Sequence, residues 1–161
     1  MPELYQIEQE ESTQKGKFLT FTLGEELFGV DISYVTEINN LLTVVPLPGT
    51  PDYFKGVVSL RGRIIPVIDM RLKLRKQPAD YDDRTCIVIV NPGKVPTGLI
   101  VDKVADVVGI ADENIELPSR FASSGSSRYL QGIGKTEDKL VLILNCGELL
   151  MEDDCLLCGN H

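Results

Sequence analysis

Apolar and polar residues alternate along several short stretches of this chain, with the two-residue period that is typical of half-buried β-strands. In the first stretch, residues 17–23, Leu19, Phe21 and Leu23 alternate with two threonines. Further stretches of this kind lie between glycine, proline or polar residues, at 27–30, 42–45, 56–60, 63–69, 84–90, 97–101, 104–110, 129–134 and 139–144. The pattern therefore predicts ten short strands.

Two short helices are expected beside these strands. Asp31 has the position of an N-cap before a helix over residues 32–38, which the pair Asn39-Asn40 ends. Asn145, followed three residues later by Glu148, matches a capping box and predicts a C-terminal helix near residues 149–150.

The stretches 56–60 and 63–69 are separated only by Arg61 and Gly62, which predicts a tight hairpin. Gly62 can adopt a positive φ in such a turn at little cost. Pro66 has no backbone N–H, so we expect its strand to be an edge strand or to contain a bulge at that point.

The expected strands fall into two groups of five, separated by a polar loop over residues 73–83. Short strands with frequent glycine and proline favour closed or nearly closed barrels. We therefore expect a mainly all-β protein of two small barrels packed side by side. The first lobe covers roughly residues 17–75 and the second roughly 83–145, between an N-terminal tail (1–16) and a C-terminal tail (151–161).

Composition narrows the classes of partner. The chain has 161 residues, and its formal net charge is −8. An acidic surface argues against nucleic acid and anionic membranes, because both need lysine and arginine to neutralise phosphate. The sequence contains no apolar run of 18 residues and no secretory signal, so we expect a cytoplasmic protein whose four cysteines are thiols.

Few residues suggest catalysis or metal binding. The chain has one histidine, His161, at its end, so no base is available for a serine or cysteine nucleophile, and we expect no enzymatic activity. Cys155, Cys158 and His161 have spacing that suits zinc, although a structural zinc site takes four ligands. A thiol- or zinc-dependent sensor is therefore an alternative to the simpler interpretation, in which these cysteines pack on a C-terminal helix.

Four segments in order resemble the conserved blocks of the CheW-like domain family. They are FLTFTLGEELFGVDISYVTEI (18–38), KGVVSLRGRIIPVIDMR (55–71), GLIVDKVADVVGI (98–110) and YLQGIGKTEDKLVLILN (129–145). The resemblance implies two SH3-like five-stranded barrels over about residues 17–150. It also implies a non-enzymatic chemotaxis adaptor without cofactors, which couples the cytoplasmic tips of methyl-accepting receptors to the regulatory domain of the histidine kinase CheA. Such an adaptor is recruited to receptor arrays at the inner face of the membrane, as a monomer that associates weakly with itself. A role in another chemosensory pathway fits the same resemblance.

The resemblance also assigns roles to individual residues. Arg61 matches the family's hallmark arginine, as a receptor contact or as a donor that only stabilises the turn. Val35 and Glu37 match the VxEI pattern of the expected first helix. Gly56 and Gly62 match family glycines that serve backbone geometry.

Val104 and Val107 match positions on the second lobe's side of a receptor-binding groove. On a regular strand, two residues three positions apart point to opposite faces. These two valines can line one groove only if their strand bulges or bends between them.

Overall fold

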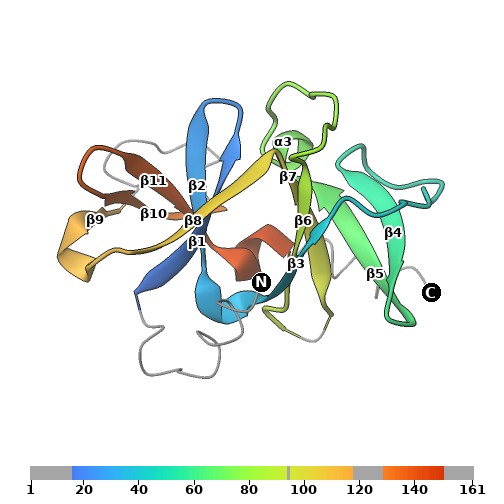
Figure 1. Ribbon diagram of the computed structural model, residues 1–161, viewed down its shortest axis with the longest axis horizontal. Helices are drawn as coiled ribbons and strands as arrows, with labels where there is room; N and C mark the ends of the chain where they lie inside the picture. The colour runs from blue at the N-terminus through green and yellow to red at the C-terminus, as the bar shows by residue number, and fades with distance from the viewer. Residues whose placement is uncertain (1–15, 94, 118–128, 151–161) are drawn as a thin grey trace.

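The computed structural model describes residues 16–93, 95–117 and 129–150, and most of these residues lie in two β-sheets that form two lobes side by side (Figure 1). The six-stranded sheet has the order β8 (Lys103–Gly109), β1 (Lys17–Leu23), β2 (Glu26–Asp31), β11 (Leu140–Leu144), β10 (Leu130–Lys135), β9 (Ile115–Glu116). The five-stranded sheet has the order β3 (Val35–Asn40), β6 (Cys86–Val90), β7 (Thr97–Val101), β5 (Arg63–Asp69), β4 (Phe54–Leu60). The expected mainly all-β, two-lobed architecture is confirmed.

The lobes do not follow one another along the chain. Residues 17–31 pair with strands from residues 103–144, whereas residues 35–69 pair with strands from residues 86–101. Each sheet therefore draws on both of the consecutive segments, roughly 17–75 and 83–145, that we expected to be separate lobes. The chain crosses between the sheets after β2, and it crosses back between β7 and β8.

The expected helix over residues 32–38 is wrong. A single 3-10 turn, η1 (Ile32–Tyr34), leads directly into β3, which pairs antiparallel with β6. Val35, Thr36 and Ile38 are β-branched and suit a strand, so the partner strand decides the conformation. The Asp31 cap is nevertheless present, since its carboxylate accepts a hydrogen bond from the Ser33 amide at 2.9 Å.

Two further expectations need correction near β4. Residues 42–45 form no strand. Val45 makes a single antiparallel bridge with Val57, in which the amide of each residue donates to the carbonyl of the other. Strand β5 is not an edge strand, because it lies between β7 and β4. Its pairing with β7 begins at Val67, so at Pro66 it has only β4 as a neighbour, and the missing N–H leaves the ladder intact.

The helix ends agree only partly with the sequence pattern. A short helix that the pattern did not predict, α3 (Met70–Lys73), follows β5, and the Asp69 carboxylate caps it at the Leu72 amide. At the other end of the described chain, residues 146–150 are helical. The expected cap is present there, because Asn145 Oδ1 accepts from the Glu148 amide at 3.1 Å.

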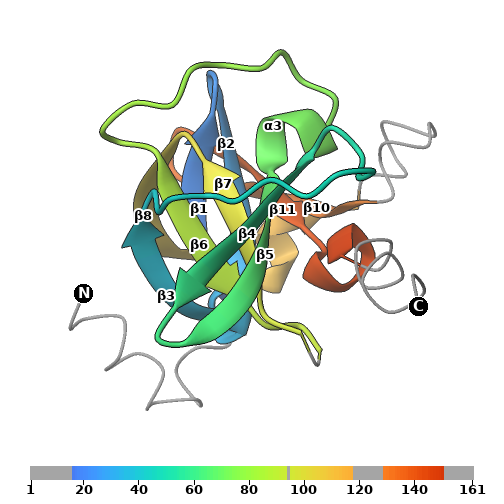
Figure 2. The same cartoon turned by 90° about the vertical axis from the view of Figure 1, so that its right-hand side faces the viewer.

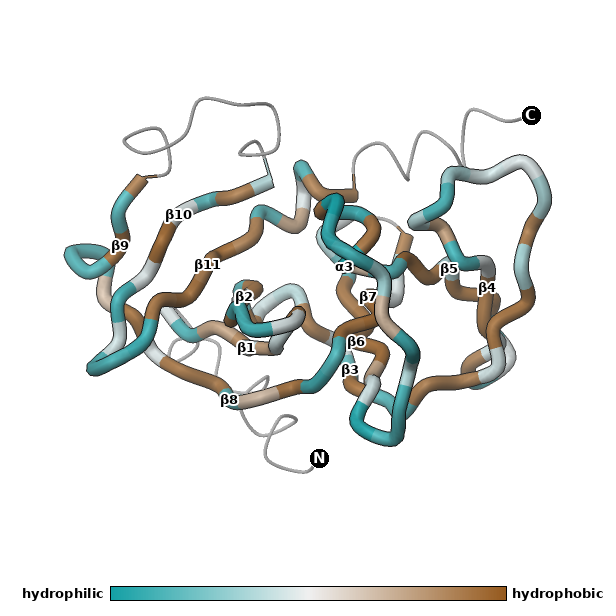
Figure 3. The backbone as a smooth tube through the Cα atoms, turned by 90° about the horizontal axis from the view of Figure 1, so that it is seen from above, coloured by the Kyte–Doolittle hydropathy of each residue, from teal (hydrophilic) through white to brown (hydrophobic). Residues whose placement is uncertain are grey.

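The main hydrophobic core, which we call the seam core, joins the two sheets. It contains Leu19, Phe21 and Val30 of the six-stranded sheet together with Val88 and Leu99 of the five-stranded sheet, all essentially inaccessible to solvent. A separate cluster fills the five-stranded lobe: Val58, Ile65, Val67, Ile87, Ile89 and Ile100. The apolar residues follow the strands, while the connecting loops are mostly polar (Figure 3). Because one core is shared, each sheet is buried against the other.

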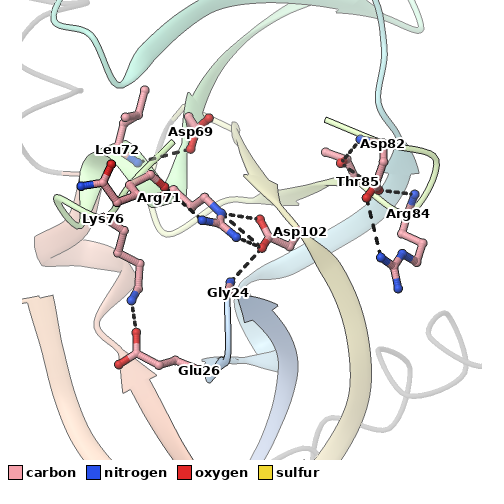
Figure 4. Close-up of polar contacts among 11 residues, drawn as sticks. Gly24, Glu26, Asp69, Arg71, Leu72, Lys76, Asp82, Arg84, Thr85 and Asp102 are labelled. Carbon is pink, nitrogen blue, oxygen red and sulfur yellow. Dashed lines mark hydrogen bonds and ion pairs between the residues drawn. The ribbon is translucent and has the colours of Figure 1, made fainter. Parts of the chain in front are cut away.

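A charged clamp fixes the crossing between β7 and β8. Asp102 accepts from the Arg71 guanidinium, at 2.9 Å from Nε and 2.5 Å from Nη2, and from the Gly24 amide at 2.8 Å (Figure 4). Arg71 belongs to α3, and Gly24 lies in the turn between β1 and β2. The Arg71 guanidinium, by hydrogen bonding, holds the pKa of the Asp102 carboxyl below its usual range despite partial burial. One carboxylate thus joins elements of both lobes.

Candidate functional site

Strand β3 carries two of the residues that the sequence singles out, and a bulge divides them between its two faces. Val35 lies opposite Val90 and Glu37 lies opposite Ile89, so Thr36 is an extra residue in the ladder. The Thr36 hydroxyl donates to the Ile89 carbonyl at 3.2 Å. The bulge turns Val35 toward the seam core and Glu37 toward the interior of the five-stranded lobe.

On its seam-core face, β3 presents Val35 and Ile38. They lie opposite Val90 and Val88, which are two residues apart and both belong to the seam core. Val35 is only 4% exposed, so its side chain is a core side chain, whereas Ile38 is half-buried. Val35 and Ile38, three positions apart, share a face here because the strand is bulged between them.

Strand β8 contains the bulge that the Val104 and Val107 assignment requires. Val107 lies opposite Leu19 and Val104 lies opposite Phe21, with the register shift between them. Leu19 and Phe21 are two residues apart on β1 and therefore point to the same face. Val104 and Val107 are accordingly on one face, both half-buried and both packed against the seam core.

The opposite face of β3 meets the tip of the hairpin between β4 and β5. Arg61 and Gly62 form its turn with φ values of 53° and 79°, the left-handed pair that joins two strands in a type I′ turn. From this turn, Arg61 Nη1 forms an ion pair with Glu37 Oε1. The second oxygen of Glu37 accepts from Asn39 Nδ2 at 2.6 Å. Both carboxylate oxygens therefore have hydrogen-bond partners.

This contact joins the two outermost strand positions of the five-stranded sheet, since β3 and the β4–β5 hairpin lie at its opposite ends. The Glu37 side chain is 13% exposed and the Arg61 side chain 66% exposed. The carboxylate is thus held in place inside the lobe, while most of the Arg61 side chain is exposed to solvent. Figure 2 looks onto this lobe, with β3 beside the tip of the β4–β5 hairpin.

The five candidate residues therefore form two groups connected by β3. One group is apolar and lies on the seam core: Val35, Val104 and Val107. The other is polar and consists of Glu37 and Arg61. Strands β3 and β8 run along the same side of the molecule (Figures 2 and 3), which brings the two groups to one side.

Gly56 and Gly62 have different structural requirements. Gly62 lies in the turn, and a Cβ there would meet nothing within 4 Å. Gly56 lies in β4 beside a register shift, with φ 138°, and a Cβ there would come within 2.1 Å of the Val45 carbonyl oxygen. The close approach at Gly56 is what permits the Val45–Val57 bridge.

The sequence pattern did not identify two polar residues that hold the site together, Asn39 and Thr20. Asn39 is half-buried against Glu37. Thr20 is 1% exposed and bonds to the backbone of β8. Thr20 stands at a polar position of the alternating stretch 17–23, so the sequence pattern contained no signal that it is buried.

The described residues contain no group of three or more histidine, cysteine, aspartate or glutamate side chains that could hold a metal ion. Cys155, Cys158 and His161 lie outside the described residues. Cys146 is a free thiol, and burial raises its pKa to about 12. No helix within the described part of the chain is long and apolar enough to cross a bilayer.

Comparisons with known proteins place this architecture. The family model of the CheW-like domain matches residues 17–154. The chain is 37% identical over 144 residues to Chemotaxis protein CheW of Klebsiella aerogenes, covering 89% of this chain and 87% of that protein. It is 30% identical over 146 residues to Chemotaxis protein CheW of Helicobacter pylori, with 90% and 87% covered. Among solved structures, the scaffolding protein TtCheW from Thermoanaerobacter tengcongensis matches with a TM-score of 0.75 and 35% identity, over 81% of this chain and 88% of that one.

Proposed function

The chain belongs to the CheW-like domain family, with its two SH3-like lobes, and is a chemotaxis adaptor; from that premise we propose that it joins the cytoplasmic tips of methyl-accepting receptors to the regulatory domain of the kinase CheA. Its role is to hold these partners in register and so regulate the kinase, without catalysing a reaction itself. We place it in the cytoplasm, recruited to receptor arrays at the inner face of the membrane, as a monomer with weak self-association.

The observation that carries the receptor part of this proposal is that the ion pair between Glu37 and Arg61 lies on the same side of the molecule as the half-buried valines of β8. The guanidinium is oriented by a carboxylate that is itself held by Asn39. An oriented arginine on the same side as partly exposed apolar residues suits an amphipathic helix, which offers both polar and apolar side chains. The receptor tip then packs its apolar face on Val104 and Val107 and its polar edge on Arg61.

In this proposal, some of the five candidate residues contact the receptor and the others hold those contact residues in position. Arg61, Val104 and Val107 expose surface that a helix can cover. Val35 is buried, so it contributes by holding β3 against the seam core, and Glu37 contributes by orienting Arg61. Fully burying a valine stabilises by about 1.5–3 kcal/mol, and a half-buried valine gains roughly half of that. Two half-buried valines and one arginine supply less than the roughly 8 kcal/mol of a micromolar complex, so this contact is weak by itself and multivalency in an array increases it.

The test is binding of a receptor cytoplasmic fragment to the wild type, Arg61→Ala and Arg63→Ala. Arg63 is exposed on the same hairpin and is the matched control. We expect Arg61→Ala to weaken binding by about tenfold, or about 1.4 kcal/mol, while Arg63→Ala binds like the wild type. Equal binding by all three folded proteins would move the receptor contact away from the hairpin tip. No binding by the wild type would refute the receptor role.

A further inference from the structure

Resting on this proposed function, we propose that Thr20 is the positioning residue that sets the β8 side of the receptor site, by holding the bulge that brings Val104 and Val107 onto one face. Thr20 is only 1% exposed, so in this proposal it acts through its hydrogen bonds to the backbone of β8 and not by touching the receptor.

The first step is the geometry of the bulge. Thr20 stands between Leu19 and Phe21, whose β8 partners are Val107 and Val104. Two residues of β8, Ala105 and Asp106, therefore oppose the single residue Thr20. A bulge of this kind leaves one residue of the longer strand outside the regular ladder of backbone hydrogen bonds.

The second step is the hydrogen bonding at that point. Thr20 Oγ1 donates to the Asp106 carbonyl at 2.8 Å, and the Asp106 amide donates to the same Oγ1 at 3.0 Å. A hydroxyl can do both, because it has one donor and two acceptor positions. One side chain thus replaces the ladder bonds of the bulged residue.

The third step is the consequence for the valines. Without the bulge, Val104 and Val107 would point to opposite faces of β8. With it, both pack on the seam core near Leu19 and Phe21. Since β8 is the outer strand of its sheet among the described residues, no described strand on its other side holds the register. The Thr20 hydroxyl is therefore the contact that favours the bulged register over the regular one.

The test compares Thr20→Val, which keeps the shape and removes the hydroxyl, with Thr20→Ser, which keeps the hydroxyl. Thr22→Val, two residues further along the same strand, is the matched control. We expect Thr20→Val to bind the receptor fragment about tenfold more weakly, while Thr20→Ser and Thr22→Val bind like the wild type.

A direct measurement separates positioning from general stability. In Thr20→Val, the Asp106 amide should exchange its hydrogen faster, and nuclear Overhauser contacts from the Val107 methyls to Leu19 should weaken, while amides of the five-stranded lobe keep their protection. Wild-type binding by a folded Thr20→Val protein would overturn the inference. If Thr20→Val fails to fold, Thr20→Ser decides, since reduced binding by that folded variant would overturn it as well. Failure of the wild type to bind the fragment refutes the proposed function instead.

Discussion

The carboxylate of Glu37 and the guanidinium of Arg61 form an ion pair that connects strand β3 to the tip of the β4–β5 hairpin. The pair is asymmetric, because Glu37 is largely enclosed and also bonded to Asn39, whereas most of Arg61 is exposed. An enclosed carboxylate needs its hydrogen bonds more than an exposed guanidinium does. The geometry therefore suits a fixed acceptor that orients a solvent-facing cation.

This asymmetry predicts that Arg61→Ala leaves the protein folded. A largely exposed partner contributes about 1 kcal/mol or less to stability, and alanine meets the same φ restriction in the turn as arginine does. We expect an unchanged circular dichroism spectrum and a urea midpoint that corresponds to a loss of about 1 kcal/mol or less. An unfolded Arg61→Ala protein would show that Arg61 is chiefly structural.

A substitution at Asn39, which bonds to Glu37, should change the stability of the protein more than the same substitution at the neighbouring Asn40. Replacing Asn39 with aspartate places a second carboxylate where the amide now bonds Glu37 at 2.6 Å. Two carboxylates that share a site repel each other at neutral pH, so we expect Asn39→Asp to lose about 1–2 kcal/mol of unfolding free energy. Asn40→Asp, at an exposed position of the same strand, is the control.

The pH dependence of these two variants gives an independent check. Repulsion raises the pKa of one carboxyl in folded Asn39→Asp, so protonation on acidification relieves it. Urea titrations should therefore show the difference between the variants shrinking from pH 7 toward pH 4. A constant difference would contradict close contact between residues 37 and 39.

The Asp102 clamp predicts an acid dependence of stability. The pKa of Asp102 in the folded protein lies below its unfolded value, mainly because of the Arg71 hydrogen bonds. Its contribution is therefore fully present above the unfolded pKa, near 4, and is lost as pH falls through the folded pKa. We expect Asp102→Asn to cost about 2 kcal/mol at pH 7 and to make the acid limb of the stability curve less steep.

Asp80→Asn, in the exposed loop before β6, is the control for that measurement. Thermal or urea unfolding from pH 7 to pH 3 should show that the stability of Asp80→Asn falls with decreasing pH as steeply as that of the wild type. If Asp102→Asn retained the wild-type acid limb, the clamp between the lobes would not contribute to stability.

The two glycines should differ sharply in their tolerance of alanine. At Gly62 a methyl group meets open space, so the cost is that of a positive φ, about 1–2 kcal/mol. At Gly56 the methyl group would overlap the Val45 carbonyl and force the bridge to Val57 apart. We expect Gly56→Ala to lose more than 3 kcal/mol, in the range of severe backbone and packing substitutions, as measured by urea denaturation. Equal effects of the two substitutions would argue against the close approach at Gly56.

Local patterns in the sequence predict much of the fold. The alternation of residues 17–23 gives β1 its bounds, and the Arg61-Gly62 pair between two apolar stretches predicts the hairpin. The caps at Asp31 and Asn145 are also present, because a cap depends on neighbouring residues. Such features are readable since the residues that form them lie within a few positions of one another.

The remaining errors come from contacts between distant segments. Val35 and Ile38 are three residues apart, which suits a helix face, but a bulge opposite β6 produces the same spacing in a strand. The exchange of strands between the lobes depends on which strands pair with β1 and β2. No local pattern in the sequence specifies these partners. The Thr20 and Asn39 contacts likewise appear only when β8 and β3 are in place.

A bridging experiment tests whether this protein joins a receptor to the kinase. A receptor cytoplasmic fragment is immobilised, a CheA regulatory domain is added, and its retention is measured with and without this protein. If the protein is an adaptor, the kinase domain is retained in excess of background only when the wild-type protein is present, and Arg61→Ala lowers this retention while Arg63→Ala does not. Contradiction would come from retention of the kinase domain that is unchanged by the wild-type protein, when both partners are folded.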